Sequence, residues 1–167
     1  MCVAARTYRR SSGTLKGSKD FRSRMNVLML EELRAALILV VEDVHEIRDG
    51  IERLLKADGY RVVLARDELE GIESAQLMRP DLILVNWTGL PGQVLPVVRR
   101  IRERSAIGNQ IPMVFWIESI DEGEEVEVEG NVFLTRPDSF NQLRGLLARL
   151  LDREVRRVHV SDQFATE

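Results

Sequence analysis

Short apolar runs alternate with amphipathic segments along most of this chain. The apolar runs have the length and β-branched content of buried strands and lie at 37–41, 61–65, 82–85, 113–117 and 131–134. In the segments between and after them, apolar residues recur at helical spacing, at 45–57, 68–78, 95–104 and 140–155. Strands that alternate with helices predict an α/β fold, a parallel sheet joined by right-handed crossovers with helices on both faces.

One interval breaks this alternation. Residues 118–129 contain seven acidic residues in twelve positions, no basic residue and almost no apolar residues at helical spacing. Residues 125–129 read Glu-Val-Glu-Val-Glu, which is the period-two alternation of a strand. We therefore expect the fourth helix, the one before the last strand, to be short or missing, with a mobile acidic loop as the alternative.

The charge of the chain is unevenly distributed. Its 167 residues carry a formal net charge of −3. Residues 1–25 contain seven basic residues and one acidic residue, a sum of +6, so the remainder carries −9. An acidic body argues against a nucleic-acid-binding domain, although the basic segment leaves open an alternative function as a nucleic-acid-associated regulator.

The composition indicates one folded domain with tails. With 44% hydrophobic residues, the chain is long enough for a proper core. We predict a disordered basic arm at 1–28, rich in Arg, Ser, Gly and Lys, a folded domain at 29–156 and a flexible tail at 157–167. Two interpretations of the arm stay open: a functional segment, or an upstream extension of a protein that starts at Met25 or Met29.

The sequence predicts neither a membrane protein nor a secreted one. The longest apolar run, 35–41, is too short to span a bilayer, and no apolar stretch follows the basic N-terminus as in a secretory signal. The one cysteine, Cys2, excludes an internal disulfide. We expect a cytoplasmic protein that has no membrane partner.

Polar residues stand at the ends of two predicted strands. Glu42 and Asp43 follow the run at 37–41, and Asn86 follows the run at 82–85. Because the carboxyl ends of parallel strands meet at one edge of the sheet, these residues predict a site there, and their oxygen atoms suit a hard cation. Asn86 supplies a neutral amide, which offers one carbonyl oxygen and no nucleophilic carboxylate.

Taken together, residues 36–151 resemble a response-regulator receiver domain, the phosphoacceptor module of two-component signalling. The resemblance implies a flavodoxin-like, three-layer fold whose five parallel strands have the order 2-1-3-4-5. It also implies that Glu42 and Asp43 correspond to the metal-binding acid pair of the family. Asn86 stands where the family has its phosphorylated aspartate.

The same resemblance assigns positions near the ends of the last two strands. Ile117 stands where the family has a Thr or Ser, and Phe133 matches its switch aromatic residue. Arg136, which precedes Pro137, stands where the family has a lysine before proline.

Three of these positions depart from the family pattern. Asn86 cannot form an acyl phosphate, because an amide has no nucleophilic carboxylate. Ile117 has no hydroxyl group to bind a phosphoryl group, and Arg136 carries its charge on a planar fork rather than on a compact ammonium. The sequence therefore predicts a pseudo-receiver, a receiver domain that is not phosphorylated.

The acid pair has two interpretations. Glu42 and Asp43 are weak or vestigial Mg²⁺ ligands, or they are carboxylates that cap the first helix. We expect no cofactor, with Mg²⁺ bound weakly if at all. We further expect Arg136 to reach Asp43 or Glu42 and to take the place of the cation.

The expected function is that of a stand-alone degenerate receiver in two-component signalling. We expect it not to be an enzyme and, because of Asn86 and Ile117, to act independently of phosphorylation. No output domain fits in the remaining residues, so we expect it to act by protein–protein interaction. The expected partner is another signalling protein, or a second copy bound through 118–137 and the last helix. A nucleotide- or flavin-dependent enzyme is a further alternative, which the lack of a Gly-x-Gly-x-x-Gly or P-loop pattern makes improbable.

Overall fold

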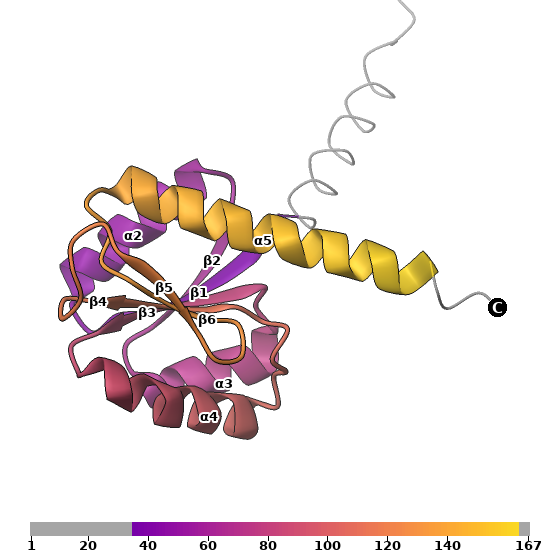
Figure 1. Cartoon of the computed structure of the whole chain (residues 1–167), viewed down its shortest axis with the longest axis horizontal. Coiled ribbons are helices and arrows are strands. Elements are labelled where there is room, and N and C mark those ends of the chain that lie inside the picture. The colour runs from indigo at the N-terminus through magenta and orange to yellow at the C-terminus, as the bar shows by residue number, and fades with distance from the viewer. Residues whose placement is uncertain (1–34, 164–167) are drawn as a thin grey trace, which may run out of the picture. The chain divides into compact units, whose positions relative to one another are not determined.

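The computed structural model of the chain describes residues 35–163, and within the last helix it describes side chains as far as Asp152 (Figure 1). The arm predicted at 1–28 lies outside the described residues, as do the first six residues of the domain predicted at 29–156. The nucleic-acid alternative, which depends on that arm, therefore stays a prediction.

The core of the fold is a six-stranded sheet with the order β2-β1-β3-β4-β6-β5. Its strands are β1 (Leu37–Val41), β2 (Arg61–Ala65), β3 (Leu82–Trp87), β4 (Met113–Ile117), β5 (Glu125–Val128) and β6 (Val132–Thr135). The first four strands and β6 are parallel and have the predicted order 2-1-3-4-5, with β6 as the fifth strand. The flavodoxin-like arrangement is confirmed.

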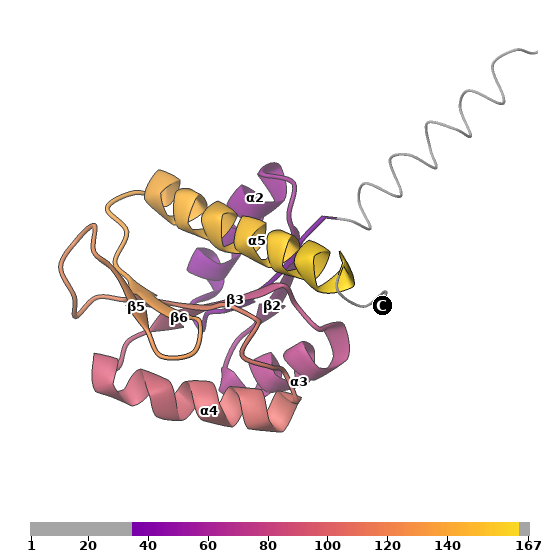
Figure 2. The same ribbon diagram turned by 45° about the vertical axis from the view of Figure 1, so that its right-hand side comes forward.

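Helices cover both faces of the sheet, as Figures 1 and 2 show. They are α2 (His45–Ala57), α3 (Glu68–Met78), η1 (Pro91–Gln93), α4 (Val94–Ser105) and α5 (Phe140–Gln163). The helices α2 and α5 lie over one face, and α3 and α4 lie over the other. Between residues 35 and 163, no helix combines the length and the apolar character needed to cross a membrane.

Two apolar clusters, one on each face, hold these layers together. Alternate residues of a strand point to opposite faces. In β3, Ile83 and Val85 therefore pack with the helices α3 and α4, whereas Leu82 and Leu84 pack with α2 and α5. A strand that must be apolar on both faces reads as a continuous apolar run, which is the pattern by which the sequence predicted β1, β3 and β4.

The interval between β4 and β6 contains a strand in place of a helix. The strand β5 pairs antiparallel with β6, and residues 118–131, all of which are described, contain no helix. The expectation of a short or missing fourth helix and the strand-like alternation at 125–129 are both confirmed. The predicted sheet of five parallel strands needs one correction, because β5 adds a sixth, antiparallel strand at its edge. A strand with Glu on one face and Val on the other can bury only one face, which suits an edge.

The last helix is longer than predicted. We predicted that it ends at Val155, whereas α5 continues to Gln163. The flexible tail expected at 157–167 stays a prediction. Neither Pro nor Gly occurs after Gly145. A helix that packing has already nucleated extends until a residue stops it, and this segment contains no such residue. Residues 164–167 lie outside the described residues.

Candidate functional site

The carboxyl ends of β1 and β3 bring Glu42 and Asn86 together. In the register of these parallel strands, Val41 lies beside Val85, so the next residues along the two strands lie side by side. Nδ2 of Asn86 donates a hydrogen bond to Oε2 of Glu42 at 2.5 Å. Glu42 is only 1% exposed and Asn86 is half-buried, so this bond is partly shielded from water, which strengthens a hydrogen bond to a charged group.

The second carboxylate oxygen of Glu42 is also occupied. Oε1 accepts a hydrogen bond from the backbone N–H of Val44 at 2.8 Å. Nη1 of Arg48 donates to the backbone carbonyl of Glu42 at 2.8 Å, which brings a positive charge to the same loop. A buried carboxylate is costly unless it is hydrogen-bonded, and both carboxylate oxygens of Glu42 accept hydrogen bonds from protein N–H groups.

Asp43 does not join Glu42 in a common site. Asp43 is exposed, whereas the neighbouring Glu42 is buried. Val44, the residue before helix α2, makes no side-chain capping bond, and its N–H instead donates to Glu42. The capping interpretation of the acid pair therefore describes Glu42, while Asp43 lies in the solvent at the start of the helix.

The arrangement of Glu42, Asp43 and Asn86 does not fit a Mg²⁺ site. Both oxygens of Glu42 accept hydrogen bonds from N–H groups, and Asp43 is exposed. A carboxylate only accepts hydrogen bonds, so the bond at 2.5 Å requires that Asn86 turn its NH₂ group, not its oxygen, toward Glu42. Within residues 35–163, no three His, Cys, Asp or Glu side chains gather in a group that could hold a metal ion. Weak Mg²⁺ binding stays a prediction from the sequence.

Ile117 lies on the other face of the sheet from Glu42. Its side chain is fully buried in the cluster under α3 and α4. In the strand register Ile117 lies beside Trp87, which packs against Phe115 in an edge-to-face arrangement with ring centroids 6.2 Å apart. The position that we matched to the hydroxyl residue of the family is thus part of the core.

A hydroxyl group that the sequence analysis missed lies in the row of Asn86. The strand register aligns Asn86 with Trp116 and Trp116 with Thr135. Thr135 is fully buried, and its Oγ1 makes no hydrogen bond with any group in the described part of the chain. Thr135 is a polar residue at the end of the last apolar strand run, next to Arg136, and this position is the signal by which the sequence could have identified it. The family pattern instead assigns roles to Arg136 and Pro137.

Phe133, the switch-equivalent residue, is buried. It is 5% exposed and packs in the cluster between the sheet and the helices α2 and α5. Its ring also forms one wall of a hollow between β5 and α5. Pro137 follows β6 and is half-buried, and its equivalence to the proline of the family stays a prediction.

Arg136 does not reach the acid pair, so that expectation is wrong. Nη1 of Arg136 donates to the backbone carbonyls of Glu118 and Ile120, each at 3.2 Å. Its backbone N–H donates to the carbonyl of Glu124 at 3.2 Å, and its carbonyl accepts from the N–H of Gly123 at 2.7 Å. The loop that leads into β5 brings carbonyl groups next to the guanidinium, which has five donors to satisfy. Arg136 therefore holds the 118–124 loop.

The loop after β3 folds against the side chain of Trp87. Nε1 of Trp87 donates to the carbonyl of Leu90 at 3.3 Å. A Cβ atom at Gly89 would lie 2.7 Å from the indole ring of Trp87, which is closer than a side chain tolerates. A glycine at this position lets the loop fold under the Trp87 ring, one residue before the Leu-Pro-Gly segment begins.

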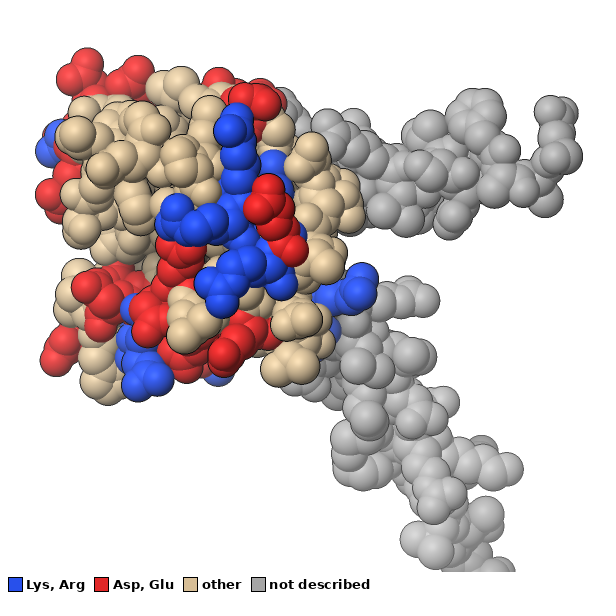
Figure 3. All heavy atoms as spheres, turned by 90° about the horizontal axis from the view of Figure 1, so that it is seen from below, with Lys and Arg blue, Asp and Glu red and all other residues tan. Residues whose placement is uncertain are grey.

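The outer face of α3 and α4 carries mixed charge. Figure 3 shows basic side chains in the middle of this face with acidic ones around them. Arg100 binds Glu68 through two hydrogen bonds of 2.8 and 2.7 Å, and Arg99 lies 4.0 Å from Glu129. Carboxylates therefore offset the charge of these two arginines, whereas a nucleic-acid-binding surface carries an excess of positive charge.

Comparisons with known proteins agree with this fold. The response regulator receiver domain family matches residues 38–148. The transcriptional regulatory protein CseB of Streptomyces coelicolor is 34% identical over 102 residues, which are 60% of this chain and 42% of that protein. The KDP operon transcriptional regulatory protein KdpE of Escherichia coli is 28% identical over 120 residues, which are 70% of this chain and 51% of that protein. The chain thus spans about half the length of these curated relatives.

Solved structures show the same architecture. The receiver domain of the hybrid histidine kinase CckA matches with a TM-score of 0.51 at 26% identity, over 69% of this chain and 98% of that one. The Vibrio cholerae chemotaxis protein CheY4 matches with a TM-score of 0.52 at 22% identity, over 70% of this chain and 98% of that one. At the latter identity the likeness is one of fold alone.

Proposed function

The chain belongs to the response regulator receiver domain family of two-component signalling, and we propose that it is a pseudo-receiver that acts by binding another signalling protein without being phosphorylated. It is not an enzyme in this proposal, and it works in the cytoplasm. The curated relatives are named as transcriptional regulators. Because the chain spans about half of their length, transcriptional output is not part of the proposal.

The hydrogen bond between Asn86 and Glu42 carries this proposal. An aspartate at position 86 would place a second negative charge beside a buried carboxylate, and a cation would be needed to balance the two. The Asn86 amide carries no charge and donates a hydrogen bond to Glu42 instead. The site therefore has no nucleophile to phosphorylate, and both oxygens of its one buried carboxylate already accept hydrogen bonds from N–H groups.

The surroundings of this bond support the same function. Ile117 fills the core, and Arg136 is bound to loop carbonyls, so neither side chain is arranged to hold a phosphoryl group beside residue 86. In this proposal a partner binds the surface of the folded domain, without any contact to a phosphoryl group. Self-association through 118–137 and α5 is the second form of the proposal, although the ion pair that joins Glu125 to Arg149 already satisfies part of that charge within one chain.

A phosphorylation assay tests the proposal. The full chain is incubated with acetyl phosphate and Mg²⁺, and intact mass is measured beside a receiver that has the aspartate, as a positive control. We expect no mass increase of one phosphoryl group in this chain and a clear increase in the control. A phosphoryl adduct on the full chain that is lost on mild alkaline treatment, as an acyl phosphate is, would overturn the proposal.

A further inference from the structure

The strand β5 leaves one edge of the sheet open. It pairs with β6 on one side, and no strand in the described part of the chain lies along its other side. In an antiparallel pair, successive residues direct their backbone N–H and C=O groups alternately toward the partner strand and away from it. The carbonyl of Glu124 accepts a bond from Arg136, so by this alternation the groups of Glu125 and Glu127 point outward.

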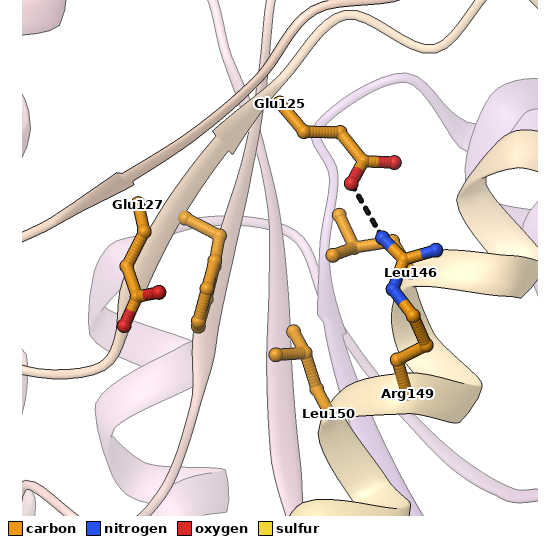
Figure 4. Close-up of a pocket in the computed structure, with 6 residues that line it drawn as sticks. Glu125, Glu127, Leu146, Arg149 and Leu150 are labelled. Atoms are coloured by element: carbon orange, nitrogen blue, oxygen red, sulfur yellow. Dashed lines mark hydrogen bonds and ion pairs between the residues drawn. The ribbon is translucent and has the colours of Figure 1, made fainter.

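Along β5, acidic side chains on one face of the strand alternate with apolar side chains on the other. Val126 and Val128 pack against the cluster under α3 and α4 and are partly buried. Glu125 and Glu127 are exposed and line the hollow on the α5 side, as Figure 4 shows. The open edge therefore has an acidic face and an apolar face along the same four residues.

The contacts of β5 hold it in place before any partner arrives. Glu125 forms an ion pair with Arg149 of α5, and Nε2 of Gln142 donates to the carbonyl of Gly123 at 2.7 Å. Arg136 binds the loop that leads into the strand. A strand that is already ordered costs a partner less conformational entropy on binding.

Two copies of β5 are poorly suited to pair with each other. In a symmetric antiparallel pair, Glu125 and Glu127 of one copy would lie across from, or diagonal to, the same residues of the other. Like charges in those positions destabilise a sheet, and charged residues on edge strands commonly serve to prevent such pairing. An extended segment with basic residues on the matching face would meet no such repulsion.

We propose that the free edge of β5 binds an extended polypeptide segment of a partner protein, one with basic residues at every second position and apolar residues between them. The segment adds to the sheet as a further strand, and its backbone binds the outward N–H and C=O groups of Glu125 and Glu127. Its basic side chains lie beside these two carboxylates, and its apolar side chains continue the face of Val126 and Val128. This inference rests on the proposed protein-binding function and specifies its surface.

The hollow beside β5 gives room for the basic side chains. It measures about 180 Å³ and is lined by Glu125, Glu127 and Arg149 together with the apolar residues Phe133, Leu146 and Leu150 (Figure 4). A lysine or arginine side chain has an apolar stem and a charged head, so its stem suits the apolar wall and its head suits the exposed Glu127, whereas Glu125 is already paired with Arg149.

Peptide binding to the full chain tests the proposal. A short fluorescent peptide of alternating Lys and Val is titrated with the protein, and anisotropy is recorded. The control peptide has the same sequence but carries N-methyl groups at alternate backbone positions, on the edge that faces β5. We expect the first peptide to bind and the methylated one to lose at least about tenfold in affinity, because main-chain bonds supply much of strand addition.

Three variants locate the site. Glu127→Pro removes an outward N–H group and a charge, which an edge strand tolerates, and we expect it to abolish binding. Glu127→Gln removes the charge alone and should weaken binding by about two- to fivefold. Glu73→Gln removes an exposed carboxylate from α3, far along the chain from β5, and should leave binding unchanged. A circular dichroism melt checks that each variant remains folded.

Other outcomes overturn the proposal. Equal binding of the two peptides would show electrostatic adsorption without strand addition, and equal weakening by Glu73→Gln would lead to the same conclusion. A dimer that the peptide disrupts would identify a second copy as the occupant. Each of these results leaves the phosphorylation assay unaffected, so failure of the β5 site is distinguishable from failure of the pseudo-receiver proposal.

Discussion

Nδ2 of Asn86 lies 2.5 Å from Oε2 of Glu42, in a pocket where Glu42 has almost no contact with water. This hydrogen bond joins the ends of β1 and β3, which are neighbours at the centre of the sheet. It therefore links the stability of the fold directly to the identity of the residue at position 86.

Replacing Asn86 with Asp should make the protein depend on a cation. Asn86→Asp exchanges a hydrogen bond for repulsion between two carboxylates, and we expect the free energy of unfolding at pH 7 to fall by about 2–4 kcal/mol. Millimolar Mg²⁺ should restore part of that loss in Asn86→Asp and have little effect on the unchanged protein. Urea unfolding with and without Mg²⁺ measures both effects. Asn86→Ala is the matched control, because it removes the bond without adding charge, and Mg²⁺ should not restore its stability.

Replacing Arg136 with Ala should loosen one loop rather than the acid pair. The substitution removes the hydrogen bonds to the carbonyls of Glu118 and Ile120, at a cost of about 1–2 kcal/mol. Hydrogen exchange should become faster at 118–124 and remain unchanged at 42–44. If Mg²⁺ restored the stability of Arg136→Ala, the guanidinium would be acting on the acid pair after all, contrary to the observed contacts.

Replacing Thr135 with Val should stabilise the fold. The Oγ1 atom of Thr135 is buried and makes no hydrogen bond with the described residues, so it has lost its bonds to water without gaining others. A methyl group of the same shape removes that penalty, and we expect a gain of about 1 kcal/mol in the free energy of unfolding. Thr135→Ser keeps the hydroxyl and loses a methyl group, so it should destabilise. A loss of stability in Thr135→Val would reveal that the hydroxyl has a partner in solution.

The ion pair between Glu68 and Arg100 should contribute fully to stability at neutral pH and lose that contribution in acid. Hydrogen bonds from Arg100 hold the pKa of Glu68 below its ordinary range, although its partial burial acts in the opposite direction. A lowered pKa in the folded state gives stability at neutral pH that disappears as the pH falls through that pKa. Glu68→Gln should therefore melt at a slightly lower temperature than the unchanged protein at pH 7, and the difference should shrink as the pH falls below the ordinary pKa of a glutamate and vanish below the lowered pKa of Glu68.

The size of this effect is limited by solvent. Both side chains are partly exposed, so salt screens their attraction, and the difference between Glu68→Gln and the unchanged protein should also shrink at high ionic strength. Glu73→Gln on the same helix serves as the control. A difference in melting temperature that persisted at low pH would show that Glu68 acts through packing instead of charge.

The parallel part of the sheet was predictable because its strands have to be apolar on both faces. The apolar run from Leu82 to Val85 predicts a buried strand even when the neighbouring strands are unknown. The strand β5 was partly predictable: the alternation of Glu and Val indicated a strand with one buried face, but not its partner strand or its direction. The partner strand and the direction of β5 depend on the loop before Glu125 and on the tight turn at Gly130 and Asn131. Both turn residues adopt positive φ values.

The site was less predictable than the fold because it depends on where individual side chains point. That Glu42 and Asn86 would lie near one another followed from parallel strands, but the direct bond between them required the register of β1 and β3. Arg136 was assigned to the wrong partner because a long side chain binds whichever acceptors its surroundings provide. Here the acceptors are loop carbonyls, whose positions no sequence pattern specifies.

The bond between Asn86 and Glu42 has a consequence for timing. An acyl phosphate is a covalent mark that persists until water removes it, so its hydrolysis rate sets how long a message lasts. The hydrogen bond between the amide and the carboxylate breaks and re-forms without covalent chemistry, so it does not store a signal. In the pseudo-receiver proposal, the duration of the signal is therefore set by how fast a partner dissociates and by how many copies of the protein the cell makes.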